Sequence, residues 1–151
     1  MKTENILNEY KTYSYEKKLL VQFIAKDEKL FDKKRFKTLN QFIEESTNDE
    51  IEKLIEIIEN VENQSEYNEL KFHYMNREYI VGNYKDIKYI AKEKCKEYIE
   101  DCILDQIPQE YRGYFDDEMY IRDYAQDIFD NEYEKCLFIN DLSLSIYRLR
   151  N

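Results

Sequence analysis

Carboxylates are the side chains of this sequence most able to do chemistry, and they gather between Glu97 and Glu134. That segment holds thirteen acidic residues and two basic ones, Arg112 and Arg122, so its charge of −11 exceeds the −10 of the whole chain. Six tyrosines lie in the same segment: Tyr98, Tyr111, Tyr114, Tyr120, Tyr124 and Tyr133. Carboxylates beside tyrosines can attract a basic partner by charge and anchor it by aromatic contact.

Five of these acids have a spacing that places them on one side of a helix, which we expect from about Asp116 to Tyr133. They follow one another at intervals of seven, four, three and four residues: Asp116, Asp123, Asp127, Asp130 and Glu134. Carboxylates one helical turn apart are about 5.4 Å apart, similar to the phosphates of a nucleic-acid strand at roughly 6–7 Å. Such a ridge could occupy a basic groove built for DNA or RNA. The expected partner-binding residues are Asp116, Asp117, Tyr120, Asp123, Tyr124, Asp127, Asp130 and Glu134, with Tyr120 or Tyr124 as an anchor if exposed.

Other kinds of site have little support in the sequence. His73 is the single histidine, and no Cys-x-x-Cys or His-Glu-x-x-His motif accompanies it, so a zinc site lacks ligands. Two glycines are too few for a glycine-rich phosphate loop. Adjacent acids at Asp116, Asp117 and Glu118 leave acid–base catalysis or a hard cation open as an alternative. We expect no catalytic residue, no metal and no cofactor.

Composition favours a folded, mainly helical protein. The chain has 151 residues, 42% hydrophobic and 15% aromatic, with two glycines and one proline. This suits one domain, or one domain with a small helical lobe, and few tight glycine turns. No apolar run is long enough to cross a membrane and no signal peptide is recognisable, so we expect a cytoplasmic protein. A net charge of −10 disfavours direct binding to nucleic acid or to anionic membrane.

Hydrophobic spacing predicts one or two helices within residues 4–37, although residues 18–26 could instead form a strand. Thr47 and Glu50 have the spacing of a capping box before a helix at about 48–63. That helix lies in a second acidic patch, because residues 38–69 hold ten acids and Lys53 as the one base. We expect residues 1–68 to form a helical N-terminal region.

Residues 69–151 are expected to form a hairpin, two helices and a strand. Alternation from Leu70 to Val81 predicts a hairpin, in which a turn at Asn76 and Arg77 would pair Tyr74 with Tyr79 and Phe72 with Val81. A helix capped by Asp86 and stopped by Pro108 follows, then the acidic helix, and then a strand at about 142–149 that could join the hairpin. The apolar stripe of the first of these helices comprises Ile87, Ile90, Ala91, Cys95, Tyr98, Ile99 and Cys102. The fold class is therefore α+β, mostly helical, with helices packed on a small antiparallel sheet.

The runs EYIVGNYKDIKYIAKEKCKEYIEDCI and EYRGYFDDEMYIRDYAQDIF resemble small acidic proteins of phages and mobile elements. The resemblance covers Leu70 to Phe129, and some proteins of that group are anti-CRISPR or anti-restriction proteins. It implies a non-enzymatic inhibitor, in the host cytoplasm, whose acidic surface binds a basic nucleic-acid-binding protein such as a CRISPR effector nuclease. An immunity protein that neutralises a basic toxin nuclease is the first alternative. A phage accessory protein without inhibitory activity is another.

Overall fold

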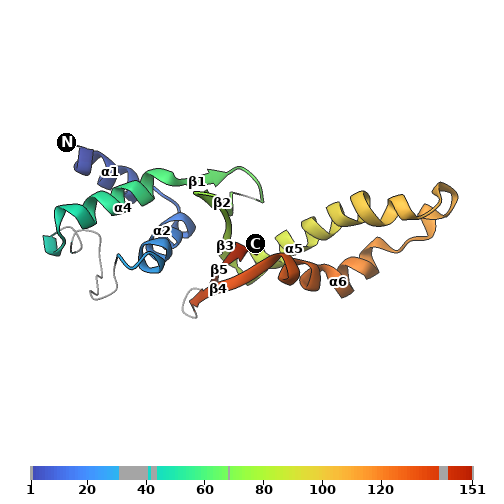
Figure 1. The fold of residues 1–151 in the computed structure, drawn as a ribbon. Coiled ribbons are helices and arrows are strands. Elements are labelled where there is room, and N and C mark those ends of the chain that lie inside the picture. Colours follow the sequence, from blue (N-terminus) through green and yellow to red (C-terminus); the bar gives the residue numbers. More distant parts are fainter. Residues whose placement is uncertain (1, 31–40, 42–43, 68, 140–142, 151) are drawn as a thin grey trace. The chain divides into compact units, whose positions relative to one another are not determined.

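A computed structural model describes residues 2–30, 41, 44–67, 69–139 and 143–150. The chain folds as two compact units, residues 1–81 and residues 82–151. Both combine helices with antiparallel strands, and helices predominate, so the expected α+β class is confirmed (Figure 1). The hairpin was expected to belong with residues 69–151, whereas most of it belongs to the first unit, residues 1–81.

Three described helices make up the N-terminal part of the first unit: α1 (Lys2–Lys11), α2 (Tyr15–Asp27) and α4 (Asn48–Asn60). Helix α2 shows that residues 18–26 are helical, so the strand alternative was wrong. Thr47 and Glu50 form the predicted capping box at the start of α4. The predicted helical residues beyond Leu30, up to Lys37, lie outside the described residues. Helix α4 contacts both α1 and α2, and Leu20 and Ile24 of α2 and Ile57 of α4 are buried.

Helix α4 ends earlier than the helix predicted at about residues 48–63. It stops at Asn60, and residues Val61–Gln64 form strand β1 instead of a last helical turn. Val61 is buried and pairs with Tyr74 of the neighbouring strand. A β-branched residue suits a pleated strand, and here tertiary pairing outweighs the helical spacing of Val61.

Strands β2 (Lys71–Tyr74) and β3 (Arg77–Asn83) form the expected hairpin, and β1 pairs antiparallel with β2. The predicted register was wrong, because the turn consists of Met75 and Asn76 and pairs Tyr74 with Arg77 and Phe72 with Tyr79. When the turn moves by one residue along the chain, the residue of β3 that pairs with a given residue of β2 changes by two positions. Since side chains alternate with a period of two, the faces stay as predicted: Phe72, Tyr74, Tyr79 and Val81 are buried, while Lys71 and His73 are half-buried on the other face.

The second unit begins with helix α5 (Tyr84–Tyr98), which packs along α6 (Asp117–Glu132) (Figure 1). Asn83 is the N-cap of α5, and Asp86, the predicted cap, is the third helical residue and completes a capping box with it. Regular α-helix ends at Tyr98 and continues as a π-helical turn η1 (Ile99–Ile103) and a 3₁₀ turn η2 (Leu104–Gln106). The backbone is extended at Ile107, just before Pro108, and a second 3₁₀ segment, η3 (Gln109–Tyr114), follows.

The predicted apolar stripe of α5 is correct up to Cys95 and at Ile99, and it is wrong at Tyr98 and Cys102. Ile87, Ile90, Ala91, Cys95 and Ile99 are buried, whereas Tyr98 is 41% exposed and Cys102 is exposed. A π-turn takes more residues per turn than an α-helix, so beyond Ile99 the 3.6-residue spacing no longer follows one face. This change of periodicity explains the position of Cys102.

The chain then forms two antiparallel strands, β4 (Tyr133–Ile139) and β5 (Leu144–Leu149). Strand β5 fits the predicted C-terminal strand at 142–149, of which residue 142 lies outside the described residues. Strand β4 was not predicted. The rings of Phe129, Tyr133 and Tyr147 pack together between α6 and these strands, with ring centroids 4.9 and 5.0 Å from Phe129. This aromatic core fixes the C-terminal end of α6, and with it the orientation of the acidic residues on the opposite side of that helix.

Candidate functional site

Helix α6 holds three of the predicted acids on one side. Asp123, Asp127 and Asp130 are exposed and, at about 100° per residue, lie within roughly 60° of one another around the helix axis. The opposite side carries Ala125 and Phe129, which are buried. This part of the predicted ridge therefore faces solvent.

Just before these residues, the start of α6 adds three more exposed acids. Asp116 is the N-cap, and its carboxylate accepts a hydrogen bond from the Met119 backbone nitrogen at 3.0 Å. Asp117 and Glu118 occupy the first turn, where negative charge interacts favourably with the helix dipole. We call the six residues of this helix and its cap the α6 acidic surface: Asp116, Asp117, Glu118, Asp123, Asp127 and Asp130.

Two carboxylates of the α6 acidic surface contact polar side chains of the same helix. The Arg122 side chain approaches Asp123 at 3.1 Å, and Gln126 donates a hydrogen bond to Asp130 at 3.0 Å. Both arginine and aspartate of the first pair are well exposed, with 71% and 49% of the side-chain area open to solvent. Exposed pairs of this kind are weak, on the order of 0–1 kcal/mol, so Asp123 remains available to a competing cation.

Glu134, the last predicted member of the ridge, does not lie on the helix. It belongs to β4, opposite Arg148 of β5, and accepts hydrogen bonds from Arg148 Nε at 3.0 Å and Nη2 at 2.6 Å. Arg150 also approaches it, at 4.0 Å. The α-helix ends at Glu132, so the helical spacing that assigned Glu134 to the ridge does not apply. Its charge is largely neutralised by the C-terminal arginines.

Tyrosines accompany the α6 acidic surface, as the sequence indicated. The Tyr120 ring lies between Phe115 and Tyr124, with centroid distances of 5.6 and 4.8 Å. Burial, followed by the neighbouring Tyr98, raises the Tyr120 pKa, so this phenol is neutral at physiological pH. Tyr124 is 50% exposed and so meets the condition for an anchor.

The segment between α5 and α6 extends the same character. Its acids are exposed and no lysine interrupts them: Glu100, Asp101, Asp105 and Glu110. Tyr111 and Tyr114 are 55% and 85% exposed, and neither was among the predicted site residues. Exposed large rings close to one another are typical of interaction surfaces. The tyrosine content of this segment was the sequence signal that could have identified Tyr111 and Tyr114 as site residues.

Part of the second acidic patch, residues 38–69, also forms an exposed row of carboxylates. Glu52, Glu56 and Glu59 are exposed on α4, with the same four- and three-residue spacing as Asp123, Asp127 and Asp130. The two sets belong to different units. They therefore provide matched arrays of carboxylates for mutational comparison.

For catalysis or metal binding, the described residues bring little together. Asp116 is engaged as a helix cap and Asp117 and Glu118 face solvent. Within residues 2–30, 41, 44–67, 69–139 and 143–150, no group of three or more His, Cys, Asp or Glu side chains could hold a metal ion. In the same residues, no helix is both long and apolar enough to cross a membrane.

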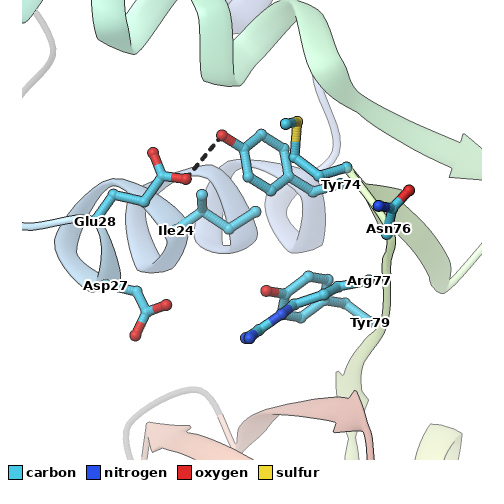
Figure 2. Close-up of a pocket in the computed structure, with 8 residues that line it drawn as sticks. Ile24, Asp27, Glu28, Tyr74, Asn76, Arg77 and Tyr79 are labelled. Atoms are coloured by element: carbon cyan, nitrogen blue, oxygen red, sulfur yellow. Dashed lines mark hydrogen bonds between the residues drawn. The ribbon is translucent and has the colours of Figure 1, made fainter. Parts of the chain in front are cut away.

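A pocket of about 400 Å³ lies in the first unit, between the C-terminal turn of α2 and the β2–β3 turn (Figure 2). Its buried lining consists of Ile24, Tyr74 and Tyr79, and its exposed lining of Asp27, Glu28, Met75, Asn76 and Arg77. The Tyr74 hydroxyl donates a hydrogen bond to Glu28 Oε1 at 2.9 Å. Sequence reasoning missed this site, because its halves are 46 residues apart and no motif links them.

Comparisons with protein-family models, with curated proteins and with solved structures found no match for this chain.

Proposed function

We propose that this protein is a non-enzymatic inhibitor that binds a basic, nucleic-acid-binding protein through the α6 acidic surface, with a CRISPR effector nuclease as its partner. One observation carries the proposal: Asp123, Asp127 and Asp130 face solvent together on the side of α6 opposite its buried residues. Their spacing along the helix is close to that of successive phosphates. A groove lined with lysine and arginine for DNA or RNA would attract this surface by the same forces.

Charge and aromatic contact support the proposal in different ways. Between residues 97 and 130 the chain has eleven acids and two bases, and a field of one sign accelerates encounter with an oppositely charged partner. Tyr124 and Tyr114 add exposed rings, and tyrosine is enriched among the residues that dominate binding energy at protein interfaces. Arginine side chains of the partner could make both kinds of contact, because guanidinium groups pair with carboxylates and stack on aromatic rings.

The proposal is tested by neutralising the three aspartates without changing their size. In a DNA-cleavage assay with a purified, guide-loaded CRISPR nuclease, the wild-type protein should inhibit cleavage. The triple variant D123N/D127N/D130N should need roughly 10–100 times more protein for the same inhibition, since three exposed charge contacts are lost.

A matched control is available on α4. The variant E52Q/E56Q/E59Q removes the same charge at the same spacing in the other unit, and it should inhibit as well as the wild type. Full inhibition by the α6 variant, or equal loss in both variants, would refute a role specific to the α6 acidic surface. Failure of the wild type to inhibit a panel of such nucleases would refute the partner.

A further inference from the structure

The pocket of the first unit presents both signs of charge around an apolar floor. Asp27 and Glu28 come from the end of α2, and Arg77 comes from the first position of β3. Figure 2 shows Asp27 and Glu28 at the end of the helix, with Ile24 next to Glu28, and the Arg77 side chain extending from the hairpin. Because the charges belong to two different elements, a ligand in the pocket meets them from opposite directions.

One of the carboxylates has a fixed position. The Tyr74 hydroxyl donates a hydrogen bond to Glu28 Oε1 at 2.9 Å, and Tyr74 itself is buried. Burial and the adjacent Glu28 carboxylate raise the Tyr74 pKa, so the phenol keeps its proton and remains a donor at physiological pH. The carboxylate of Glu28 is thereby held at the mouth of the pocket, with its second oxygen available as an acceptor.

Arg77 does not neutralise these carboxylates. In the described part of the chain, no ion pair joins it to Asp27 or to Glu28. Asp27 and Arg77 are both exposed. The C-terminal end of α2 adds partial negative charge on the same side as Asp27 and Glu28. The pocket therefore has a negative side and a positive side, separated by the space that a ligand would occupy.

This arrangement selects against ligands of a single charge. A simple cation would pair with Asp27 and Glu28 but leave Arg77 without a partner, and a simple anion would pair with Arg77 but be repelled by Asp27 and Glu28. A molecule with an ammonium and a carboxylate can satisfy both sides, and its apolar part can lie against Met75, which lines the pocket and is 69% exposed. A volume of about 400 Å³ is within the usual range of small-molecule sites.

We propose that this pocket binds a small zwitterion of the α-amino-acid class, with its ammonium group at Asp27 and Glu28 and its carboxylate at Arg77. Asn76, at the hairpin turn, adds an amide that can donate to the same carboxylate. The proposal concerns a different unit from the α6 acidic surface and does not depend on inhibition of a nuclease. It gives the first unit a ligand-binding role of its own.

Three related probes distinguish a zwitterion site from simpler alternatives. L-leucine has both charges, leucinamide lacks the carboxylate, and N-acetyl-leucine lacks the ammonium. Each is titrated into the full-length protein while amide resonances of the pocket residues are followed by NMR. Leucine should bind tightest, with shifts centred on residues 24–28 and 74–79, and N-acetyl-leucine should bind weakest because carboxylates outnumber arginine in the pocket.

Substitutions then assign each charge to its partner. R77Q should weaken leucine binding by about tenfold or more and abolish the advantage of leucine over leucinamide, since a charge-assisted hydrogen bond is lost. D27N should weaken the binding of leucine and of leucinamide and should strengthen the binding of N-acetyl-leucine, because a carboxylate that repels this anion is lost. The control R122Q/D123N removes the same two charge types from α6, and leucine should bind it as it binds the wild type.

Two results would overturn the proposal. Leucinamide binding as tightly as leucine to the wild type would show a simple cation site. The absence of shifts with all three probes at about 10 mM would show that the pocket has no ligand of this class. Since Asp27 and Arg77 are exposed, their variants should fold, and an unchanged background spectrum verifies this.

Discussion

Individual carboxylates in the acidic segment have different physical roles, although the sequence presents them as one series. Asp116 caps a helix, Glu134 is held by Arg148, and Asp127 faces solvent on α6. Removing the first affects the fold, removing the second affects strand packing, and removing the third should affect only a partner. Mutational effects on stability can therefore separate structural acids from those available for binding.

At Asp116 we predict a loss of stability. The substitution Asp116→Ala removes the acceptor for the Met119 amide and should lower the free energy of unfolding by about 1 kcal/mol, a typical value for an N-cap. Urea denaturation followed by circular dichroism measures it. Asp117→Ala, which removes a neighbouring carboxylate without that cap bond, should cost less. Equal effects of the two substitutions would contradict the capping role.

Tyr13 should give the protein a dependence on alkaline pH. Burial, with the charge of Glu9 close by, raises its pKa to about 12, above the usual value of about 10 for an unfolded chain. The neutral phenol is thus favoured in the fold, so its contribution to stability is complete below pH 10 and is lost as the pH rises through about 12. Denaturation between pH 9 and 12 should show this decline.

Absorbance of tyrosinate provides a direct measurement on the same residue. Exposed tyrosines should ionise near pH 10 and a later phase should follow towards pH 12. Tyr13→Phe should reduce the amplitude of the later phase. A single phase near pH 10, with no change in the variant, would exclude the raised pKa.

At the scale of elements, the β2–β3 turn has an unusual first residue. Met75 has a φ of 56° and begins a two-residue turn, a position that glycine normally occupies in type II′ turns. A non-glycine residue at positive φ costs about 1–2 kcal/mol. Met75→Gly should therefore stabilise the protein by about 0.5–1 kcal/mol, after the greater flexibility of glycine in the unfolded chain is subtracted.

Asn76→Gly is the matched control for this turn. Asn76 has no positive φ, so glycine there should destabilise the protein by about 0.5–1 kcal/mol. The register predicted from the sequence, with the turn at Asn76 and Arg77, requires the opposite ranking. Thermal denaturation of both variants decides between the two registers.

The elements that the sequence predicted well are those with strong local signals. The ends of α6, the capping box at Thr47, and both faces of the hairpin follow from periodicity and cap chemistry over a few residues. The hairpin register was missed because asparagine commonly accepts positive φ, whereas the structure places it on Met75. Strand β4 was missed because its partner β5 follows it and its alternation is interrupted by a bulge between Lys135 and Leu137.

Sites depend more on tertiary contacts than elements do, and prediction was correspondingly less complete. The exposed positions of Asp123, Asp127 and Asp130 follow from helical spacing alone. The neutralisation of Glu134 required the pairing of β4 with β5, and the pocket required α2 to meet a hairpin 46 residues away. Neither has a local signature in the sequence.

At the scale of the whole molecule, negative charge is concentrated in part of each unit rather than spread evenly. The α6 acidic surface and the segment before it hold most of the acids of the second unit, while residues 38–69, which include α4, hold ten of the acids of the first. The α2–hairpin pocket has mixed charge. Long-range attraction of a basic partner should thus arise from the acidic regions, and selection of a small ligand from the pocket.

The central claim is that binding to a basic protein surface depends on exposed charge. The dissociation constant for a purified CRISPR nuclease, measured by biolayer interferometry between about 0.1 and about 0.5 M NaCl, tests this most directly. Salt shortens the range of exposed charge interactions, from about 10 Å at 0.1 M to about 3 Å at 1 M. The affinity should fall at least about tenfold across this series; an affinity that stays constant would contradict the claim.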